Sequence, residues 1–112
     1  MGELAHFPKR YPIQVCFDRT ELNCILDLYG RMVAAGHWRD YAMDMGHDAA
    51  SFCAFRRAAE RPEVRIEKRP ALQRAQGQWA LIGEAGQMLK RGHELGPVLA
   101  PIERRLLKLV SG

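Results

Sequence analysis

Two segments of the chain carry apolar residues at helical spacing. In the first, the apolar residues recur every three or four positions and stop before Gly36, a residue type that often follows the last helical turn. They are Leu22, Ile25, Leu26, Tyr29, Met32 and Val33. Asp18 or Thr20 suits the position before the first turn, because a short polar side chain accepts hydrogen bonds from backbone N–H groups there. The spacing predicts an amphipathic helix over residues 19–35.

The second helical pattern lies near the C-terminal end. Its apolar positions are Leu95, Val98, Leu99, Ile102, Leu106 and Leu109, with charged residues between them. Pro97 suits a first turn, but Pro101 lacks the N–H that an interior helical position donates, and its ring crowds the preceding turn. The pattern predicts a helix over residues 101–110, with either a kink at Pro101 or a short separate turn before it.

Shorter segments alternate apolar and polar residues, which is typical of half-buried strands. The strictest alternation is at residues 64–69, where the two apolar residues fall on one face and charged residues on the other. Residues 13–17 alternate similarly and predict a short strand before the first helix. Residues 78–82 and 87–91 flank a glycine-containing turn and predict a hairpin.

A further hairpin is predicted on either side of the turn-forming residues 46–48. The aromatic and methionine side chains of residues 41–45 share one face, and residues 49–57 continue the pattern beyond the turn. Because Met and Ala are weak strand formers, a helix over residues 49–60 is the alternative.

The predicted order of elements is therefore β-α-β-β-β-β-β-α. Successive strands, rather than alternating strands and helices, favour an antiparallel sheet in an α+β fold. We expect a single antiparallel sheet of about five strands packed against two helices. Residues 1–12 show no periodicity and predict a flexible tail, which leaves residues 13–112 as a single α+β domain.

Charge is distributed unevenly along the chain. Residues 54–112 hold twelve Lys and Arg against six acids, and residues 1–53 hold five against seven, so the two parts carry +6 and −2 and sum to the net charge of +4. A one-sided field of this sign attracts an anionic partner. Alternate strand positions would place the basic side chains on the solvent face of the sheet, where Trp79 and Tyr41 would offer rings for base stacking.

The binding residues predicted on this basis are Arg56, Arg65, Lys68, Arg69, Lys90, Arg91 and Trp79. The partner they predict is DNA or RNA. The alternative interpretation of the same residues is a solvated polar face, with scattered ion pairs to Glu60, Glu63 and Glu67.

The patterns of catalytic and metal sites are missing from the sequence. Its four His and three Cys show neither HxxxH nor CxxC spacing. The glycines at 83 and 86 are not followed by the Lys and Ser or Thr of a phosphate-binding loop. Cys53 and His47 are close only in sequence, and Asp40, Asp44 and Asp48 give no sign of a carboxyl in an apolar pocket. We expect no enzymatic activity, no metal and no cofactor.

The same residues suggest a cytoplasmic protein. Cys16, Cys24 and Cys53 sit among apolar neighbours, so we expect free thiols packed as small hydrophobic groups in a reducing compartment. No apolar run approaches the length of a membrane span, and the N-terminus lacks the pattern of a signal peptide.

Several strings of residues resemble a known family. They are residues 17–23, 28–41, 55–57, 65–70 and 89–95. They are similar to an alphaproteobacterial family, domain of unknown function 2794, and the similarity covers nearly all of the chain after the tail. The resemblance implies a small cytosolic single-domain protein and carries over no catalytic residue.

Two functions follow as hypotheses. The first is a non-enzymatic nucleic-acid-binding or regulatory domain that uses a basic sheet face. The second is a protein-interaction adaptor, which would use an apolar patch at Met43, Met45 and Phe52, because methionine-rich surfaces adapt to partners.

Overall fold

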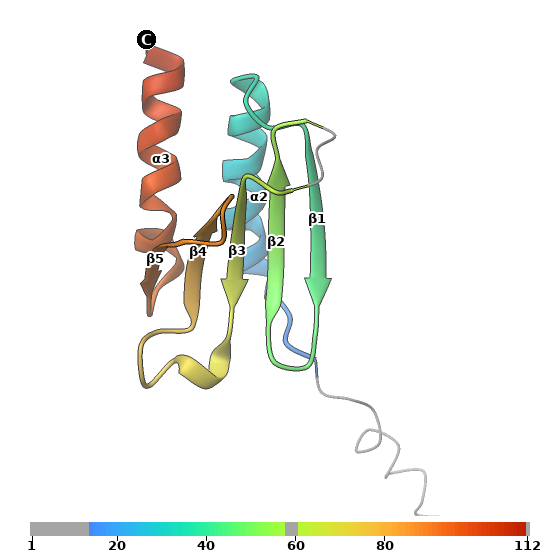
Figure 1. The fold of residues 1–112 in the computed structure, drawn as a ribbon, viewed down its shortest axis with the longest axis vertical. Helices are drawn as coiled ribbons and strands as arrows, with labels where there is room; N and C mark the ends of the chain where they lie inside the picture. Colours follow the sequence, from blue (N-terminus) through green and yellow to red (C-terminus); the bar gives the residue numbers. More distant parts are fainter. Residues whose placement is uncertain (1–13, 58–60, 112) are drawn as a thin grey trace, which may run out of the picture.

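The computed structural model describes residues 14–57 and 61–111. Along the described chain, one α-helix precedes five strands and a second α-helix follows them (Figure 1). The elements are α2 (Arg19–Ala34), β1 (Asp40–Met45), β2 (Ala50–Phe55), β3 (Val64–Lys68), the 3₁₀ turn η2 (Pro70–Leu72), β4 (Trp79–Gly83), β5 (Met88–Gly92) and α3 (Leu95–Ser111). Each strand pairs antiparallel with the next, giving the sheet order β1-β2-β3-β4-β5. The predicted α+β class, with a five-stranded antiparallel sheet and two helices, is confirmed.

The strand predicted before the first helix is wrong over the part that the structure describes. Residues 14–17 are irregular, and their backbone link to the sheet is a hydrogen bond of 2.8 Å from the N–H of Val15 to the carbonyl of Gly46. Phe17 is buried and stacks on Trp79, with ring centroids 6.1 Å apart. The apolar pattern there reflects an anchored aromatic rather than strand pairing. Ile13 and the predicted tail, residues 1–12, lie outside the described residues.

Helix α2 has defined caps at both ends. The N–H of Glu21 donates to the Asp18 carboxylate at 2.8 Å, and the N–H of Asp18 donates back to the Glu21 carboxylate at 2.9 Å. Such a reciprocal capping box satisfies two backbone donors that the helix leaves unpaired. At the other end, the N–H groups of Gly36 and His37 donate to the carbonyls of Val33 and Met32, and Gly36 adopts a φ of 79°. This Schellman arrangement turns the chain from α2 toward β1.

Helix α3 begins six residues earlier than the predicted start at Pro101. The structure shows one continuous helix from Leu95 to Ser111 with Pro101 inside it. Pro101 removes one backbone hydrogen bond, but Val98 and Leu99 are essentially fully buried on the preceding turn. Burial of these side chains stabilises the turn against the loss at the proline, since tertiary packing outweighs local preference in most protein helices.

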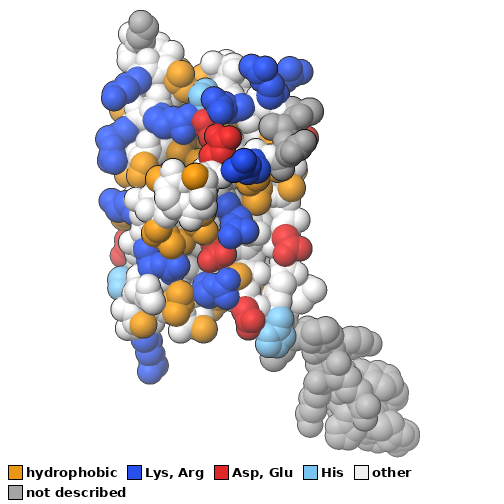
Figure 2. All heavy atoms as spheres, viewed as in Figure 1, with side chains coloured by type: hydrophobic (Ala, Val, Ile, Leu, Met, Phe, Trp, Pro, Cys, Tyr) orange, Lys and Arg blue, Asp and Glu red, His pale blue; other side chains and the backbone are white. Residues whose placement is uncertain are grey.

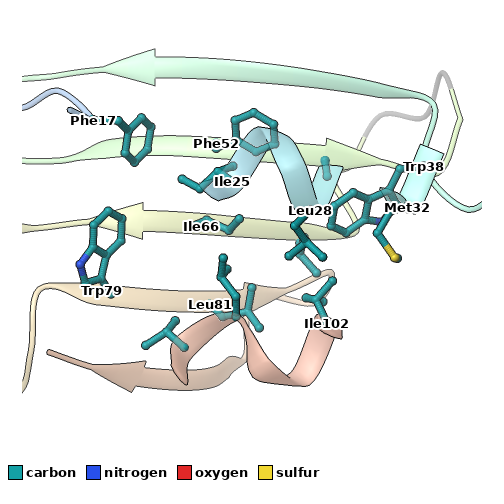
Figure 3. Close-up of a cluster of buried hydrophobic side chains, with 14 of the residues drawn as sticks. Phe17, Ile25, Leu28, Met32, Trp38, Phe52, Ile66, Trp79, Leu81 and Ile102 are labelled. Atoms are coloured by element: carbon teal, nitrogen blue, oxygen red, sulfur yellow. The ribbon is translucent and has the colours of Figure 1, made fainter. Parts of the chain in front are cut away.

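The core lies between the helices and one face of the sheet (Figure 3). Phe52, Ile66 and Leu81 occupy neighbouring positions on β2, β3 and β4, and each is at most 1% exposed. The helices cover this row with one stripe each: Ile25, Leu28 and Met32 from α2, and Val98, Leu99, Ile102 and Leu106 from α3. The fold therefore has two layers, with both helices on the same side of the sheet.

Both predicted hairpins are confirmed, so β2 excludes the alternative helix over the described part of residues 49–60. In the second hairpin, Gly86 has a φ of 84° and the N–H of Gly83 donates to the carbonyl of Gln87 at 2.8 Å. Over residues 14–57 and 61–111, neither helix has the length and apolar character needed to cross a bilayer.

Candidate anion-binding surface

One face of the sheet carries neither helix nor strand among the described residues. The strand register defines it, because Cys53 pairs with Arg65 and Arg65 pairs with Ile82. We call it the open face; its side chains belong to Asp40, Ala42, Asp44, Ser51, Cys53, Phe55, Arg65, Glu67, Arg69, Ala80, Ile82, Met88 and Arg91. Figure 2 views the molecule from this side and shows Lys and Arg side chains spread over it, with hydrophobic and some acidic groups between them.

Three of the predicted binding residues lie on this side. Arg65 and Arg69 flank Glu67, with closest nitrogen-to-oxygen distances of 3.8 and 3.5 Å. Both arginines are more than a third exposed, whereas Glu67 is buried. Arg91 projects from β5 and donates to the carbonyl of Gly77 at 3.0 Å. Two guanidinium groups beside the buried carboxylate, together with Arg91 two strands away, give this part of the open face a positive charge.

Lys68 and Trp79 lie on the opposite, helix-covered face, which corrects their predicted place in the basic face. The Lys68 ammonium is 2.7 Å from the Glu21 carboxylate, 2.9 Å from the carbonyl of Cys16, and 5.8 Å from the centroid of the Trp79 ring. Trp79 is only 2% exposed and stacks on Phe17. Because strand side chains alternate, Lys68 must share the face of Ile66.

Lys90 and Tyr41 also fall on the helix side of the sheet by register. Lys90 pairs with Leu81 but lies on the edge strand β5 and stays exposed. Tyr41 stacks on Phe52 with ring centroids 5.0 Å apart. The aromatic residue that the open face does carry is Phe55, which is half-buried. Phe55 lies two positions after Cys53 and so shares its face, whereas Phe52 lies on the other face. This alternation was the signal in the sequence that could have identified Phe55.

The seventh predicted residue, Arg56, lines a hollow at the edge of the sheet where β2 ends and β3 begins. We call this hollow the arginine pocket; its volume is about 310 Å³ and it is lined by Arg56, Arg57, Arg61, Glu63 and Glu84. Arg56 bridges the two acids, at 3.7 Å from Glu63 and 3.3 Å from Glu84. The volume is at the small end of the range of ligand sites, so the pocket suits a compact group.

Glu63 is held in this pocket by polar contacts from several elements. Its side chain is 11% exposed; the indole N–H of Trp38 donates to Oε1, and Oε2 lies 2.7 Å from Arg105 and 3.0 Å from His37. Burial alone raises the pKa of Glu63, but the hydrogen bonds from Trp38 and Arg105, the charge of Arg105 and the hydrogen bond with His37 outweigh it and hold the pKa below its ordinary value. Glu63 is therefore a fixed carboxylate whose charge is matched mainly from the helix side.

Comparison with known proteins places the chain in a family. The family model described as "Protein of unknown function (DUF2794)" matches residues 15–99. The chain belongs to the DUF2794 family. The matched region contains all five strands, the open face and the arginine pocket. No curated protein and no solved structure matches the chain.

The thiols of this DUF2794 protein are more accessible than we expected from the apolar residues beside them in the sequence. Cys16 and Cys24 are exposed, and Cys53 is half-buried on the open face. Cys24 lies on the exposed side of α2, and Cys16 in the irregular segment before it. The prediction that all three cysteines pack as small core residues is wrong for Cys16 and Cys24.

The acidic residues are dispersed rather than gathered. Asp40 and Asp44 share the open face of β1 but pair with Phe55 and Ser51, four positions apart on β2. No group of three or more His, Cys, Asp or Glu side chains is arranged to hold a metal ion in the described parts of the chain. The chemistry concentrated on this surface is that of guanidinium groups, which bind oxyanions through paired N–H donors.

Proposed function

We propose that this protein binds single-stranded nucleic acid on the open face of its sheet, without catalysing a reaction on it. The observation that carries the proposal is that Arg65, Arg69 and Arg91 share, with the half-buried Phe55 and Ile82, a sheet face that no helix covers in the described residues. Sheets that present basic and aromatic side chains on one face are a recurring platform for unpaired bases.

The arginines are available for phosphates. The contacts of Arg65 and Arg69 with Glu67 are 3.8 and 3.5 Å long and involve exposed guanidinium groups. Glu67 is buried and keeps these two partners, so a phosphate would be bound by the other N–H donors of each exposed guanidinium group. A phosphate also accepts two parallel N–H donors from one guanidinium, which gives a stronger bond than these long pairs.

Phe55 and Ile82 supply an apolar surface for bases. A base that stacks on an aromatic side chain contributes roughly 1–3 kcal/mol, and the contact tolerates any base because every base has a flat face. Binding of this kind would show little sequence preference. Asp40 and Asp44 on β1 repel phosphates, so we expect the nucleic-acid strand to lie over β2 to β5 rather than cross to β1.

Salt dependence of binding to a short labelled oligonucleotide tests this function. Each phosphate neutralised on a single strand adds roughly −0.7 to the slope of log affinity against log salt, so three arginines predict a slope of about −2. Replacing Arg65 and Arg91 together by Glu should abolish binding. The matched control is Arg104→Glu, the same charge change on an exposed position of α3, which should lower affinity only slightly. Failure of the unmodified protein to bind DNA or RNA at low salt would exclude the function.

A protein-interaction adaptor is the second candidate. The apolar patch predicted for it is incomplete, because Phe52 is fully buried and only Met43 is exposed. A different surface favours the adaptor: an apolar groove between the ends of α2 and α3, where Leu107 and Val110 are 65% and 64% exposed. An amphipathic partner helix fits such a groove, because its apolar positions recur at the same spacing. Open-face substitutions would leave that contact intact, whereas Leu107→Glu would remove it.

A further inference from the structure

We propose that the arginine pocket binds a phosphate monoester, the dianionic group at the end of a phosphorylated nucleic-acid strand or on a free mononucleotide. Binding of a phosphorylated strand end rests on the nucleic-acid-binding function proposed above, whereas binding of a free mononucleotide does not. The inference begins from the charge of the pocket. Arg56, Arg57 and Arg61 line it together with Glu63 and Glu84, and Arg105 approaches Glu63 from α3. Among the described residues, the three lining arginines and Arg105 give four guanidinium groups against two carboxylates, a charge of +2.

That charge discriminates between phosphate esters. A phosphate monoester carries about −1.5 to −2 at neutral pH and has three strong acceptor oxygens, so it neutralises the pocket almost completely. An internal phosphate of a strand carries −1 and is flanked by two sugars, which would have to leave the hollow on both sides. A small pocket of about 310 Å³ with excess positive charge therefore favours an end group.

The carboxylates of the pocket do not block such a ligand. Glu63 accepts from Trp38 and Arg105 and lies 3.0 Å from His37, so its lone pairs are engaged away from the hollow. Glu84 is half exposed and lies 3.3 Å from Arg56. An exposed pair of this kind is weak, so a dianion can take the place of Glu84 beside Arg56. Glu63 then remains as a rigid support that holds Arg56 and Arg105 in position.

Arg57 and Arg61 supply the remaining donors. They form no ion pair with any acid in residues 14–57 or 61–111, and both are exposed at the rim of the pocket. Two further forked donors beside Arg56 match the three oxygens of a monoester. The pocket also adjoins the open face, because Arg56 follows Phe55 and Glu84 follows the last residue of β4. A strand stacked on Phe55 would therefore bring its terminal phosphate to this edge.

The test compares oligonucleotides that differ only in a terminal phosphate. We expect the unmodified protein to bind a short single strand with a 5′- or 3′-phosphate about tenfold more tightly than the same strand ending in hydroxyl groups, since one charge-assisted bidentate contact is lost. The double variant Arg57→Ala and Arg61→Ala should bind both strands equally. The double variant Arg65→Ala and Arg91→Ala should bind both more weakly but keep their ratio.

A second arm uses adenosine 5′-monophosphate, adenosine and inorganic phosphate in place of oligonucleotides. If the unmodified protein binds the monophosphate and the Arg57 and Arg61 variant does not, the pocket is supported. This holds even if no oligonucleotide binds; in that case only the proposed binding of single strands on the open face is refuted. Glu84→Gln should strengthen monophosphate binding, because Arg56 loses its competing partner. Four of the five changed side chains are exposed, whereas Arg91 is half-buried and donates to the carbonyl of Gly77, so circular dichroism checks that all three variants fold. Equal binding of phosphorylated and unphosphorylated probes by the unmodified protein, in both arms, overturns the proposal.

Discussion

The ammonium group of Lys68 lies 2.7 Å from the carboxylate of Glu21, the residue that closes the capping box of α2. The same Glu21 oxygen accepts the N–H of Asp18, so one carboxylate joins the start of the helix to the end of β3. Both side chains are mostly buried, at 13% and 19% exposed, so water screens the pair only partly. Lys68 thus links the two layers of the fold.

Replacing Lys68 by Ala should therefore destabilise the fold. Glu21 and the carbonyl of Cys16 would lose a charged donor in a mostly buried setting, which costs about 1–3 kcal/mol. Urea denaturation followed by circular dichroism measures the change. Lys90→Ala is the matched control, because Lys90 is exposed on the edge strand and its loss should change stability by less than about 0.5 kcal/mol. Equal midpoints for the two variants would refute the structural role of Lys68.

The backbone segments at Gly77 and Gly92 lie very close together. A Cβ added to Gly77 would lie 2.2 Å from the carbonyl carbon of Gly92, and Gly77 has a φ of 98° that other residues rarely adopt. Gly77→Ala should therefore destabilise the protein by more than the roughly 1–3 kcal/mol of backbone strain alone. Gly86→Ala isolates that strain, because Gly86 has a similar φ of 84° but open space around it. Similar thermal midpoints for the two variants would argue against the close approach.

A substitution at Gly30 should increase the stability of the protein. Gly30 lies in the interior of α2, and an added Cβ would meet nothing within 4 Å. Gly30→Ala should stabilise the protein by about 0.5–1 kcal/mol, because glycine loses more conformational freedom in a helix than alanine does. Thermal unfolding of the two proteins side by side measures the difference. A lower midpoint for the alanine variant would mean that this face of α2 is covered by something the added methyl group disturbs.

The sequence predicted the elements better than it predicted which side chains share a surface. Alternation located every strand of the sheet, since a half-buried sheet imposes a period of two. The same period places Lys68 on the helix-covered face with Val64 and Ile66. We predicted the solvent face because Lys68 is charged, but the carboxylate of Glu21 in α2 neutralises that charge. Trp79 was misplaced for a related reason, since its partner Phe17 belongs to a segment without strand pairing.

The full set of residues around Glu63 could not be predicted from the sequence. Its members come from the turn after α2, the start of β3 and the middle of α3, so that His37 and Arg105 are 68 positions apart. No local spacing marks them, and only the packing of α3 beside the end of α2 brings them together. The sequence did offer Glu63 as an ion-pair partner for the basic residues, and Arg56 lies 3.7 Å from it, but Trp38, His37 and Arg105 around Glu63 were not foreseen.

The depressed pKa of Glu63 predicts an acid-sensitive contribution to stability. A carboxyl group whose pKa is lower in the folded state than in the unfolded state stabilises the fold above its unfolded pKa, for which the ordinary value is 4.5. That contribution is lost as the pH falls below 4.5 and through the lower folded pKa. Glu63→Gln should lower the free energy of unfolding at neutral pH and reduce its dependence on pH in the acidic range below about 5. Glu84→Gln, on a half-exposed side chain, is the control. An unchanged acid dependence in Glu63→Gln would contradict the prediction.

The thiols give the last prediction. Cys24 is exposed, but partial burial and the charges of Glu103 and Asp27 raise its pKa, against the opposing charge of Arg31. Since the thiolate is the reactive form, alkylation of Cys24 in the native protein should keep accelerating above the pH at which an unperturbed peptide thiol levels off. Glu103→Gln removes one of the raising charges and should speed labelling at neutral pH. Mass spectrometry after timed alkylation resolves each cysteine, and Cys53 in the same sample is the internal control, because it contacts neither Glu103 nor α2. Faster labelling of both cysteines in the variant would indicate loosening of the fold instead of a change in the charge around Cys24.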